Sequence, residues 1–180
     1  MIDKQKYFLS FVGIISENMK RIGLLSDTHA FWDNRYVNYF SECDEIWHAG
    51  DIGSETVLRK LEEIKPVRAV YGNIDSHFLR LECPEKLRFK VEEVDVLLTH
   101  IGGYPRKYNP ALKAEIYANP PKLFVCGHSH ILKVIYDESL DMLCLNPGAA
   151  GTYGFHQVRT LLEFSIDGKR IKDLEVIELR

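Results

Sequence analysis

Short apolar runs alternate with amphipathic stretches along most of the chain. A continuous apolar run of about four to eight residues is typical of a buried strand, and apolar residues three or four positions apart indicate a helix. By these criteria, strands are predicted at 21–26, 45–50, 67–72 and 122–127, and helices at 33–41, 54–64 and 110–119. Strands and helices that alternate in this way predict an α/β fold.

Two of the predicted helices carry boundary signals. Ser54 is a favourable N-cap, and Leu58 and Leu61 behind it share one helical face. Pro110 suits the first turn of a helix, and Pro120 marks its end.

The remaining segments are mainly strand-like. Residues 86–100 are predicted to form two strands joined by a tight turn at Glu92 and Glu93. Further strands are predicted at 132–137, 142–147, 158–166 and 169–179. Asp167 and Gly168 form a hairpin signal between the last two. The sequence therefore predicts two sheets, the second of which is richer in antiparallel pairs.

Composition and charge narrow the class of protein. The chain has 180 residues, 46% of them hydrophobic, which suits one globular domain. Its formal net charge is −3 and it has no block of Lys and Arg, so we expect no long nucleic acid as a partner. No run of 18 apolar residues occurs, so we expect no transmembrane helix and no membrane partner.

Two features bear on the location of the protein. The four cysteines are spread along the chain without a C-x-x-C pair, which predicts buried free thiols and a cytoplasmic protein. Residues 1–18 imitate a signal peptide faintly, but an acidic residue lies in their charged region and no small-x-small cleavage site follows. We interpret 1–18 as an N-terminal extension of a domain at 19–180. Its apolar content makes a homodimer plausible.

Five apolar runs each end in a residue that can bind a metal ion. The residues at these ends are Asp27 and His29, Asp51, Asn73, His100, and His128 and His130. In an extended segment the side chains at i and i+2 point the same way, so each D-x-H or H-x-H pair would face one site. Ligands of open α/β sheets bind at the carboxyl ends of strands, where all of these side chains would converge. One such residue is commonly a turn or structural residue, but the whole set favours a shared site.

The residue types select the chemistry of that site. It contains carboxylates, imidazoles and one amide but no thiolate, which disfavours a structural zinc site. The set suits a divalent ion such as manganese, iron, cobalt or zinc. Seven ligands exceed what one catalytic ion with open positions needs. They suit two ions about 3.5–4 Å apart that share a bridging carboxylate.

The order of the motifs, D-x-H, G-D, G-N, H and G-H-x-H, resembles the calcineurin-like metallophosphoesterase superfamily. Within it, the chain looks like the small single-domain phosphodiesterases of bacteria and archaea, a branch that also includes the retromer subunit of eukaryotes. The resemblance runs from about Lys20 to the C-terminus. It implies a four-layer α/β/β/α sandwich with two mixed β-sheets and a metal site at the carboxyl ends of strands.

The resemblance also assigns site residues. The ligands that it implies are, for one ion, Asp27, His29, Asp51 and His130 and, for the other, Asp51, Asn73, His100 and His128, with Asp51 bridging. Asp27, Asp51, Asn73 and His100 are the implied catalytic residues. Two divalent ions and two carboxylates leave a charge of about +2 for a phosphate-ester anion, and a bridging water attacks phosphorus as hydroxide. Manganese is favoured, with iron, zinc, cobalt and nickel also compatible.

The implied activity is that of a two-metal phosphoesterase, and the branch favours a phosphodiesterase. The domain is short and has no cap insertion, so we expect an open site and a small phosphate-ester substrate. The alternative is a non-catalytic metal-binding scaffold of the same fold, a protein-interaction module like the retromer subunit. A scaffold predicts a large exposed apolar patch, whereas an enzyme predicts a polar cleft over the ions.

The match departs from the family pattern at Ile74. Many relatives have histidine after G-N, where it can protonate the leaving oxygen, and isoleucine cannot transfer a proton. Either another group serves, or the enzyme prefers esters whose leaving group needs little help. Asp75 is a candidate for orienting the ligands or an ordinary turn aspartate. His156 and Arg106 are candidates for contacting substrate or ordinary loop residues.

Overall fold

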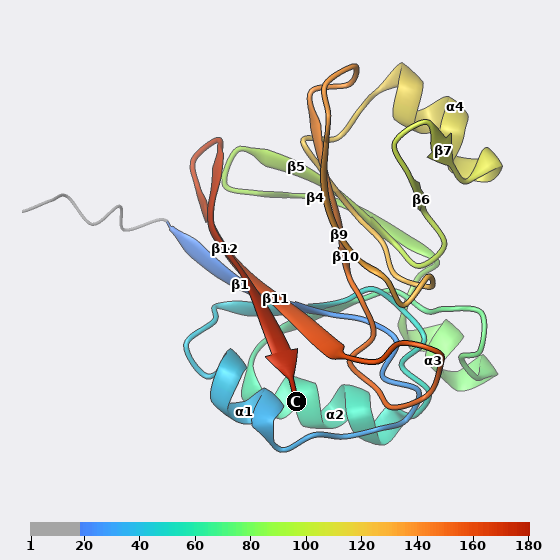
Figure 1. Cartoon of the computed structure of the whole chain (residues 1–180), viewed down its shortest axis with the longest axis vertical. Helices are drawn as coiled ribbons and strands as arrows, with labels where there is room; N and C mark the ends of the chain where they lie inside the picture. The colour runs from blue at the N-terminus through green and yellow to red at the C-terminus, as the bar shows by residue number, and fades with distance from the viewer. Residues whose placement is uncertain (1–18) are drawn as a thin grey trace, which may run out of the picture.

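Two β-sheets packed face to face, with helices on their outer sides, form the body of the protein in the computed structural model (Figure 1). The structure describes residues 19–180. The extension expected at residues 1–18 lies outside the described residues, and its role stays a prediction. The described part has no helix that is long and apolar enough to cross a membrane.

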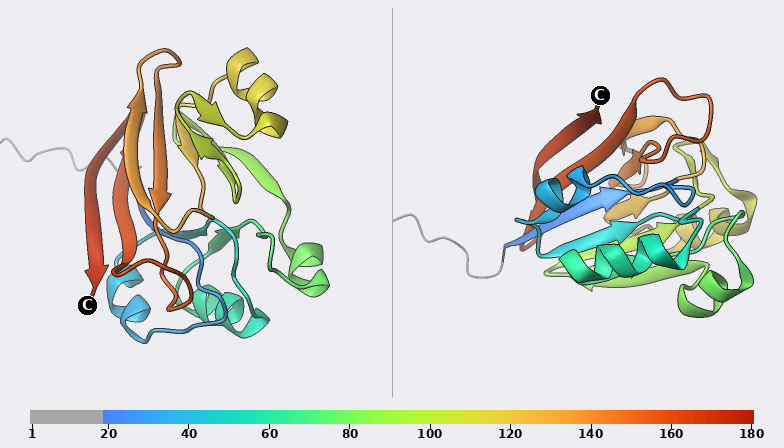
Figure 2. Two further views of the ribbon diagram at one scale, coloured as in Figure 1. Left: turned by 45° about the vertical axis from the view of Figure 1, so that its right-hand side comes forward. Right: turned by 90° about the horizontal axis from the view of Figure 1, so that it is seen from below.

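The first sheet contains the first and the last strand and has the order β12-β11-β1-β2-β3. Its strands are β1 (Lys20–Leu25), β2 (Glu45–His48), β3 (Val67–Ala69), β11 (Arg159–Asp167) and β12 (Arg170–Leu179). β1, β2 and β3 run parallel, and β11 and β12 add antiparallel pairs. Helices α1 (Arg35–Phe40) and α2 (Glu55–Ile64) lie on its outer face, and α3 (His77–Glu82) follows β3 (Figure 2).

The second sheet has the order β4-β5-β8-β10-β9. Its strands are β4 (Lys86–Val91), β5 (Val94–Thr99), β8 (Leu123–Val125), β9 (Leu132–Asp137) and β10 (Met142–Pro147). The central strands β5, β8 and β10 run parallel, and the edge strands are antiparallel. Helix α4 (Pro110–Ala118) and a hairpin of β6 (Gly103–Tyr104) and β7 (Lys107–Tyr108) cover its outer face. The expected α/β sandwich with two mixed sheets is confirmed. The expectation that the second sheet is richer in antiparallel pairs is wrong, because the C-terminal strands β11 and β12 join β1 in the first sheet and each sheet has two parallel and two antiparallel pairs.

Three apolar clusters hold these layers together. The cluster between the sheets includes Trp47, Leu98 and Phe164, none more than 1% exposed. A second cluster packs α1 and α2 on the first sheet around Phe40, and a third packs α4 on the second sheet around Phe124. Complete burial of a large apolar side chain stabilises the fold by about 1.5–3 kcal/mol. Each sheet is therefore held from both faces.

Burial on both faces explains why the central strands are continuous apolar runs in the sequence. On β1, Ile22 and Leu24 belong to the cluster between the sheets, whereas Leu25 belongs to the cluster under the helices. Alternating side chains of one strand thus enter two different cores.

Most of the predicted boundaries agree with the structure to within a few residues. Ser54 Oγ accepts a hydrogen bond from the Val57 N–H at 3.3 Å, as expected of the N-cap of α2. Helix α4 begins at Pro110, and the turn at Glu92 has a left-handed φ of 51°. The hairpin signal at residue 168 lies in the β11–β12 turn. All four cysteines are buried and free, as predicted.

The short elements α3, β6 and β7 were not predicted. Helix α3 has six residues, too few for an apolar period to stand out, although Ser76 caps it through a 3.4 Å hydrogen bond from the Leu79 N–H. The strand expected at 45–50 ends at His48, because the next turn has left-handed φ values at Gly50 and Asp51. The strand expected at 67–72 likewise ends early, at residue 69.

Candidate metal centre

Loops that follow the parallel strands of both sheets meet at one end of the sandwich. The side chains that they bring together form two groups, the first of Asp27, His29 and His130, the second of Asp51, His100 and His128. Within each group the potential ligand atoms lie within 4.8 Å of one another. Both sheets contribute to both groups, because face-to-face packing brings the carboxyl ends of β1 and β2 close to those of β5 and β8.

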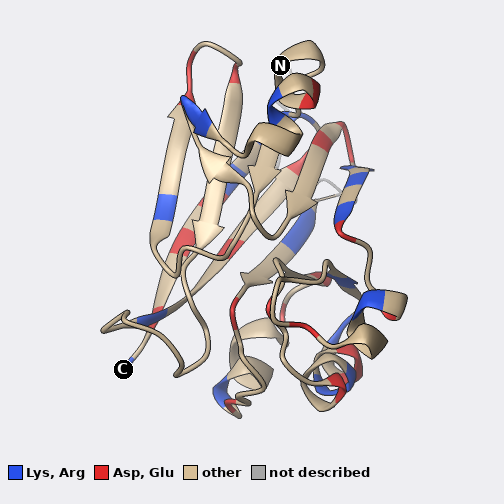
Figure 3. Ribbon diagram, turned by 90° about the vertical axis from the view of Figure 1, so that its right-hand side faces the viewer, with Lys and Arg blue, Asp and Glu red and all other residues tan. Residues whose placement is uncertain are grey.

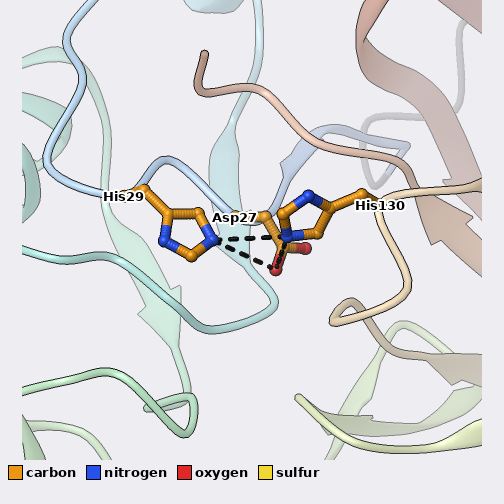
Figure 4. Close-up of side chains that lie close together, drawn as sticks. All are labelled: Asp27, His29 and His130. Atoms are coloured by element: carbon orange, nitrogen blue, oxygen red, sulfur yellow. Dashed lines mark hydrogen bonds and ion pairs between the residues drawn. The ribbon is translucent and has the colours of Figure 1, made fainter. Parts of the chain in front are cut away.

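The first group joins the loop after β1 to the loop after β8 (Figure 4). His130 Nε2 lies 3.2 Å from Asp27 Oδ1, and His29 Nε2 lies 4.0 Å from the same oxygen. The two imidazole nitrogens are 3.3 Å apart. The three side chains therefore point toward one another, an arrangement that suits the ligands of one ion.

The second group lies directly beside the first. His100 Nε2 is 3.3 Å from Asp51 Oδ2, and the ring centroids of His100 and His128 are 5.2 Å apart. Asp51 Oδ2 is also 3.7 Å from His29 Nε2 of the first group. This oxygen thus lies between the groups, where a carboxylate shared by two ions would have to be.

The backbone of the ligand loops adopts an unusual conformation. The residues with left-handed φ values, between 47° and 67°, include Asp27, His29, Asp51, His128 and His130. This conformation costs a residue with a side chain about 1 kcal/mol or more, and it persists where the surrounding structure requires it. Here the strained residues are the ones whose side chains converge in the two groups, so the strain is best explained by the function of the site.

Two glycines allow these loops to approach closely. A Cβ atom at Gly127 would lie 2.0 Å from Ser26 Oγ, and a Cβ atom at Gly72 would lie 2.0 Å from Asp51 Oδ1. No side chain fits at either position. The glycines of the G-H-x-H and G-N motifs are therefore explained by packing against the ligand loops.

Backbone hydrogen bonds orient both carboxylates. The His128 N–H donates to Asp27 Oδ2 at 3.1 Å, and the Ile74 N–H donates to Asp51 Oδ1 at 3.0 Å. The other oxygen of each carboxylate remains for the centre. His100 Nδ1 lies 2.7 Å from a backbone carbonyl oxygen, which we assign as the acceptor of its proton. When the ring is neutral, Nε2 carries no proton and is free to face a metal ion.

Asp75 supports the second group from behind. Its side chain is 4% exposed and accepts hydrogen bonds from the backbone N–H groups of Gly53, Ile52 and Gly72, at 2.7, 3.1 and 2.8 Å. These bonds join the segment after Asp51 to the turn of the G-N motif. The carboxylate therefore fixes the path of two loops that carry predicted ligands, and its role in orienting metal ligands stays a prediction.

His48 links the ligand loops through a pair of hydrogen bonds. Its Nε2 lies 2.9 Å from Thr28 Oγ1, and its Nδ1 accepts the Gly50 N–H at 3.2 Å. Thr28 Oγ1 donates its own proton to the Ile52 carbonyl at 2.9 Å, so the imidazole proton is on Nε2 and the ring is neutral. Burial lowers the pKa of His48 to about 4, which preserves this neutral form near pH 7.

The donor set and two unpaired atoms fit divalent metal ions. Asp27 Oδ1 and His100 Nε2 are buried and make no hydrogen bond within the described range 19–180. An unpaired buried polar atom costs about 1–3 kcal/mol, and a cation would satisfy both. Burial acts to raise the pKa of Asp51, but His100, the Ile74 amide and His29 outweigh it, and the pKa lies below its ordinary value. The carboxylate is thus ionised, as a metal ligand must be.

Asn73 is the seventh predicted ligand. It follows β3, is exposed, and lines a cavity of about 350 Å³ together with His100. The N–H of the next residue, Ile74, donates a hydrogen bond to Asp51 Oδ1, so Asn73 lies beside the second group. Its role as a ligand stays a prediction.

Comparisons with known proteins bear on what this centre does. The family model described as the calcineurin-like phosphoesterase superfamily domain matches residues 19–169. The chain belongs to this superfamily. A probable metallophosphoesterase of Methanothermobacter thermautotrophicus is 32% identical over 161 residues, which cover 87% of this chain and 91% of the relative. A second probable metallophosphoesterase, from Methanocaldococcus jannaschii, is 28% identical over 164 residues, which cover 87% of this chain and 81% of the relative. The chain is a metal-dependent phosphoesterase.

Solved structures agree with the fold of this phosphoesterase. Vacuolar Protein Sorting 29 from Cryptosporidium parvum matches with a TM-score of 0.75 at 20% identity, over 91% of this chain and 93% of that one. A structure described as a novel archaeal phosphodiesterase matches with a TM-score of 0.70 at 22% identity, over 88% and 99%. At these identities the likeness concerns the fold alone.

The two residues predicted to contact substrate, His156 and Arg106, lie at different distances from the centre. His156 lies before β11, with its ring centroid 5.4 Å from that of His130 and its Nε2 2.9 Å from the Gly151 carbonyl. Arg106 lies in the β6–β7 turn and lines another hollow, with residues of β9, rather than the cavity beside His100. The structure thus brings His156 to the first group and leaves Arg106 in a separate hollow. Their substrate roles stay predictions.

Three residues around the centre were missed or undervalued from the sequence. The ring centroid of Tyr153 lies 5.0 Å from that of His29, Arg80 of α3 lines the cavity at Asn73, and His48 joins the ligand loops. The N-cap Ser76 was the available signal for α3 and hence for the position of Arg80. The two others depend on long-range contacts that no local pattern records.

Proposed function

We propose that this phosphoesterase is a two-metal phosphodiesterase that hydrolyses a small phosphate ester. The observation that carries the proposal is the position of Asp51 Oδ2 between two imidazoles, 3.3 Å from His100 Nε2 and 3.7 Å from His29 Nε2. A carboxylate between two sets of ligands suits two ions better than one. The name of the archaeal structural neighbour supports the diester class.

The proposed ligands are the seven side chains expected from the motifs, with Asp51 shared. The chemistry that bound divalent ions supply is a water molecule acidified for attack on phosphorus and positive charge for the phosphoryl oxygens. The carboxylates of Asp27 and Asp51 would offset part of the metal charge and leave about +2 for a phosphate-ester anion. The His128 and Ile74 amides fix the direction of those carboxylates.

The proposal includes a preference for esters with good leaving groups. Ile74, which is 47% exposed, has no proton to give to a leaving oxygen. His156 directs its Nε2 proton at the Gly151 carbonyl, so this proton is not directed at a leaving oxygen. Aryl esters, whose leaving oxygen is stable without protonation, are therefore the expected model substrates.

The proposed metal is manganese, and iron, zinc, cobalt or nickel would suit the same oxygen and nitrogen donors. The proposed substrate is small, because the described elements include no separate cap domain. Basic and acidic positions are interspersed over the face that carries α3 and α4 (Figure 3), which does not favour long nucleic acid. Cytoplasmic location and a homodimer held by residues 1–18 complete the proposal.

A metal-binding scaffold is the second candidate. Ile74, Ile101 and Ile131 each follow a predicted ligand and are 47%, 41% and 57% exposed. Tyr153 and Phe155, 70% and 106% exposed, add apolar surface near the first group. Apolar surface of this kind suits a protein partner, and one structural neighbour is Vacuolar Protein Sorting 29. The unpaired ligand atoms inside the centre support a bound metal ion in either candidate, so turnover decides between them.

Hydrolysis of aryl phosphates tests the proposal. Metal-stripped protein is supplied with manganese and assayed on bis(p-nitrophenyl) phosphate and on p-nitrophenyl phosphate. We expect manganese-dependent turnover that is faster on the diester. Asp51→Ala is expected to lower kcat/KM by about a thousandfold and to lose bound manganese, because one carboxylate serves both groups.

Glu63→Ala, which removes an exposed carboxylate from α2, is the matched control and is expected to keep both activity and metal. Faster turnover of the monoester would contradict the diester class. Two bound ions per chain without turnover of either ester would favour the scaffold.

A further inference from the structure

We propose that the cavity beside Asn73 and His100 binds one ester arm of the substrate, and that Arg80 recognises an anionic group on that arm. The substrate class would then be a phosphodiester with a second phosphate or carboxylate on the organic group in the cavity. This inference rests on the proposed function, because it needs the scissile phosphate at the metal centre.

The cavity is built by segments that also build the centre. The β3–α3 turn, helix α3, the start of β4, the end of β5 and the start of α4 line it. Its volume of about 350 Å³ lies within the range of small-molecule sites, about 300–1,000 Å³. Asn73 and His100 belong both to the cavity wall and to the predicted ligand set. A phosphate held at the second group therefore has this cavity on one side.

Arg80 is fixed in place by the turn that carries Asn73. Its Nε donates to the Asp75 carbonyl at 2.9 Å, and its Nη2 donates to the Asn73 and Gly72 carbonyls at 2.9 and 3.3 Å. The guanidinium carbon lies 4.7 Å from the centroid of the Tyr71 ring. Because carbonyls and a ring hold the side chain, little rotamer freedom remains to be lost when a ligand binds.

The charge of Arg80 has no carboxylate partner within residues 19–180, and its Nη1 makes no hydrogen bond there. Lys86, the other cation of the cavity, pairs with Glu115 outside it. Glu85 also lines the cavity, without an ion pair to Arg80. A guanidinium with free N–H donors matches the oxygens of a phosphate or carboxylate. Arg80 is therefore the cavity group suited to an anion.

The rest of the wall suits an organic linker between two anionic groups. Tyr71, Ile101 and Leu112 supply apolar surface to the cavity. Such surface suits the carbon atoms of an ester arm. The cavity thus combines two residues shared with the predicted ligand set, an apolar wall and a fixed cation.

Two synthetic diesters with the same p-nitrophenyl leaving group test the inference. One carries an ethyl arm and the other a 2-carboxyethyl arm. For the manganese-loaded protein we expect kcat/KM to favour the carboxyethyl ester by about tenfold, the value of one charge-assisted contact. In Arg80→Gln this preference is expected to disappear. Arg170→Gln, the same change at an exposed turn arginine, is expected to keep it.

A second measurement avoids catalysis. Binding of 2-carboxyethyl phosphate to the zinc-loaded protein is followed by amide chemical shifts, with the Ala111 and Leu112 signals reporting on the cavity wall. We expect these signals to shift, and affinity to fall about tenfold in Arg80→Gln. A purely structural Arg80 would lower kcat/KM equally for both esters and leave their ratio unchanged, which would overturn the inference.

The outcomes separate the two proposals. Turnover of both diesters without an effect of Arg80 on their ratio would overturn the cavity assignment and leave the phosphodiesterase. Arg80-dependent binding of the probe without turnover of any diester would contradict the phosphodiesterase and support the anion site.

Discussion

The two groups of the metal centre hold similar ligands in different surroundings. The first group lies against the loop 151–158, whose Tyr153 and His156 rings are 5.0 and 5.4 Å from its imidazoles. The second group borders the cavity that Arg80 and Lys86 line. Aromatic rings therefore pack on one side of the centre, and a hollow that contains the Arg80 guanidinium lies on the other. The ligands alone do not show this difference.

The different surroundings would orient a bound phosphodiester in one way only. A phosphodiester has two ester groups, and only one of them can enter the cavity at the second group. In the proposed binding mode, an anionic arm there would leave the other group toward the loop that carries Tyr153. Aromatic surface at that position suits an aryl or other apolar leaving group. The ligands of the two groups are similar and do not show which ester group of the substrate would leave. The different surroundings of the groups would assign the retained arm to the cavity and the leaving group to the aromatic loop.

Removal of one imidazole from each group tests whether the groups hold separate ions. His29→Ala and His100→Ala are each expected to lose about one ion per chain and to lower kcat/KM a hundredfold or more, because each ion orients part of the reaction. Metal content by mass spectrometry and hydrolysis of the aryl diester measure both effects. His77→Ala, an exposed histidine of α3, is the control. Two ions and full turnover in either ligand variant would contradict the assignment.

His48 joins the loops of both groups, and its protonation should loosen that link. The unfolded residue binds a proton below about pH 6.5 and the folded one only below about pH 4, so acid favours unfolding between these values. We expect this residue to remove about 3 kcal/mol of the free energy of unfolding as the pH falls through that window. Urea unfolding of metal-free protein measures the effect.

His48→Gln is the matched variant, since glutamine keeps a donor and an acceptor but does not titrate. The stability gap between the two proteins is expected to narrow as the pH falls from 6.5 to 4. Parallel pH profiles would show that the His48 link does not titrate as proposed.

Ile74→His tests the missing proton donor beside the second group. We expect the variant to hydrolyse phenyl esters, which have a poorer leaving group, about tenfold faster relative to p-nitrophenyl esters. Ile74→Gln is a polar control without a transferable proton. An equal change on both esters in Ile74→His would mean that leaving-group protonation does not limit the reaction.

Tyr153→Ala tests the aromatic side of the comparison and carries the smallest expected effect. Loss of its ring beside the first group should raise KM for aryl diesters about three- to fivefold, the value of a modest aromatic contact. Tyr117→Ala, which changes an exposed tyrosine of α4, is the control. An unchanged KM would remove the aromatic loop from substrate binding.

Much of the fold and the ligand positions could be predicted from local patterns. Strands buried on both faces produce continuous apolar runs, and the polar residues that end these runs stand out against them. Asp27, Asp51 and His100 were identifiable for this reason. Turn glycines at the motifs strengthened the prediction, and Gly72 and Gly127 do pack against the ligand loops.

The surroundings of the ligands were not predictable in the same way. Helix α3 is too short for a helical period, so Arg80 had no predicted position. Its partners are carbonyl groups, which carry no sequence signal. The approach of Tyr153 to His29 depends on a loop that returns from a distant part of the chain. The predicted ligands could be identified from short sequence motifs. The residues around them, which would orient a substrate, are brought there by tertiary contacts that the motifs do not show.

The order of the ligands along the chain has a consequence for biosynthesis. The His128 amide reaches Asp27 across a separation of 101 residues. During translation, the first three strands emerge with the D-x-H, G-D and G-N motifs long before the G-H-x-H motif exists. Contacts of such long range form only after the intervening segments have been made. Because none of the predicted ligands belongs to the three apolar clusters, metal loading is expected to follow folding, and metal-starved cells should accumulate a folded apoprotein.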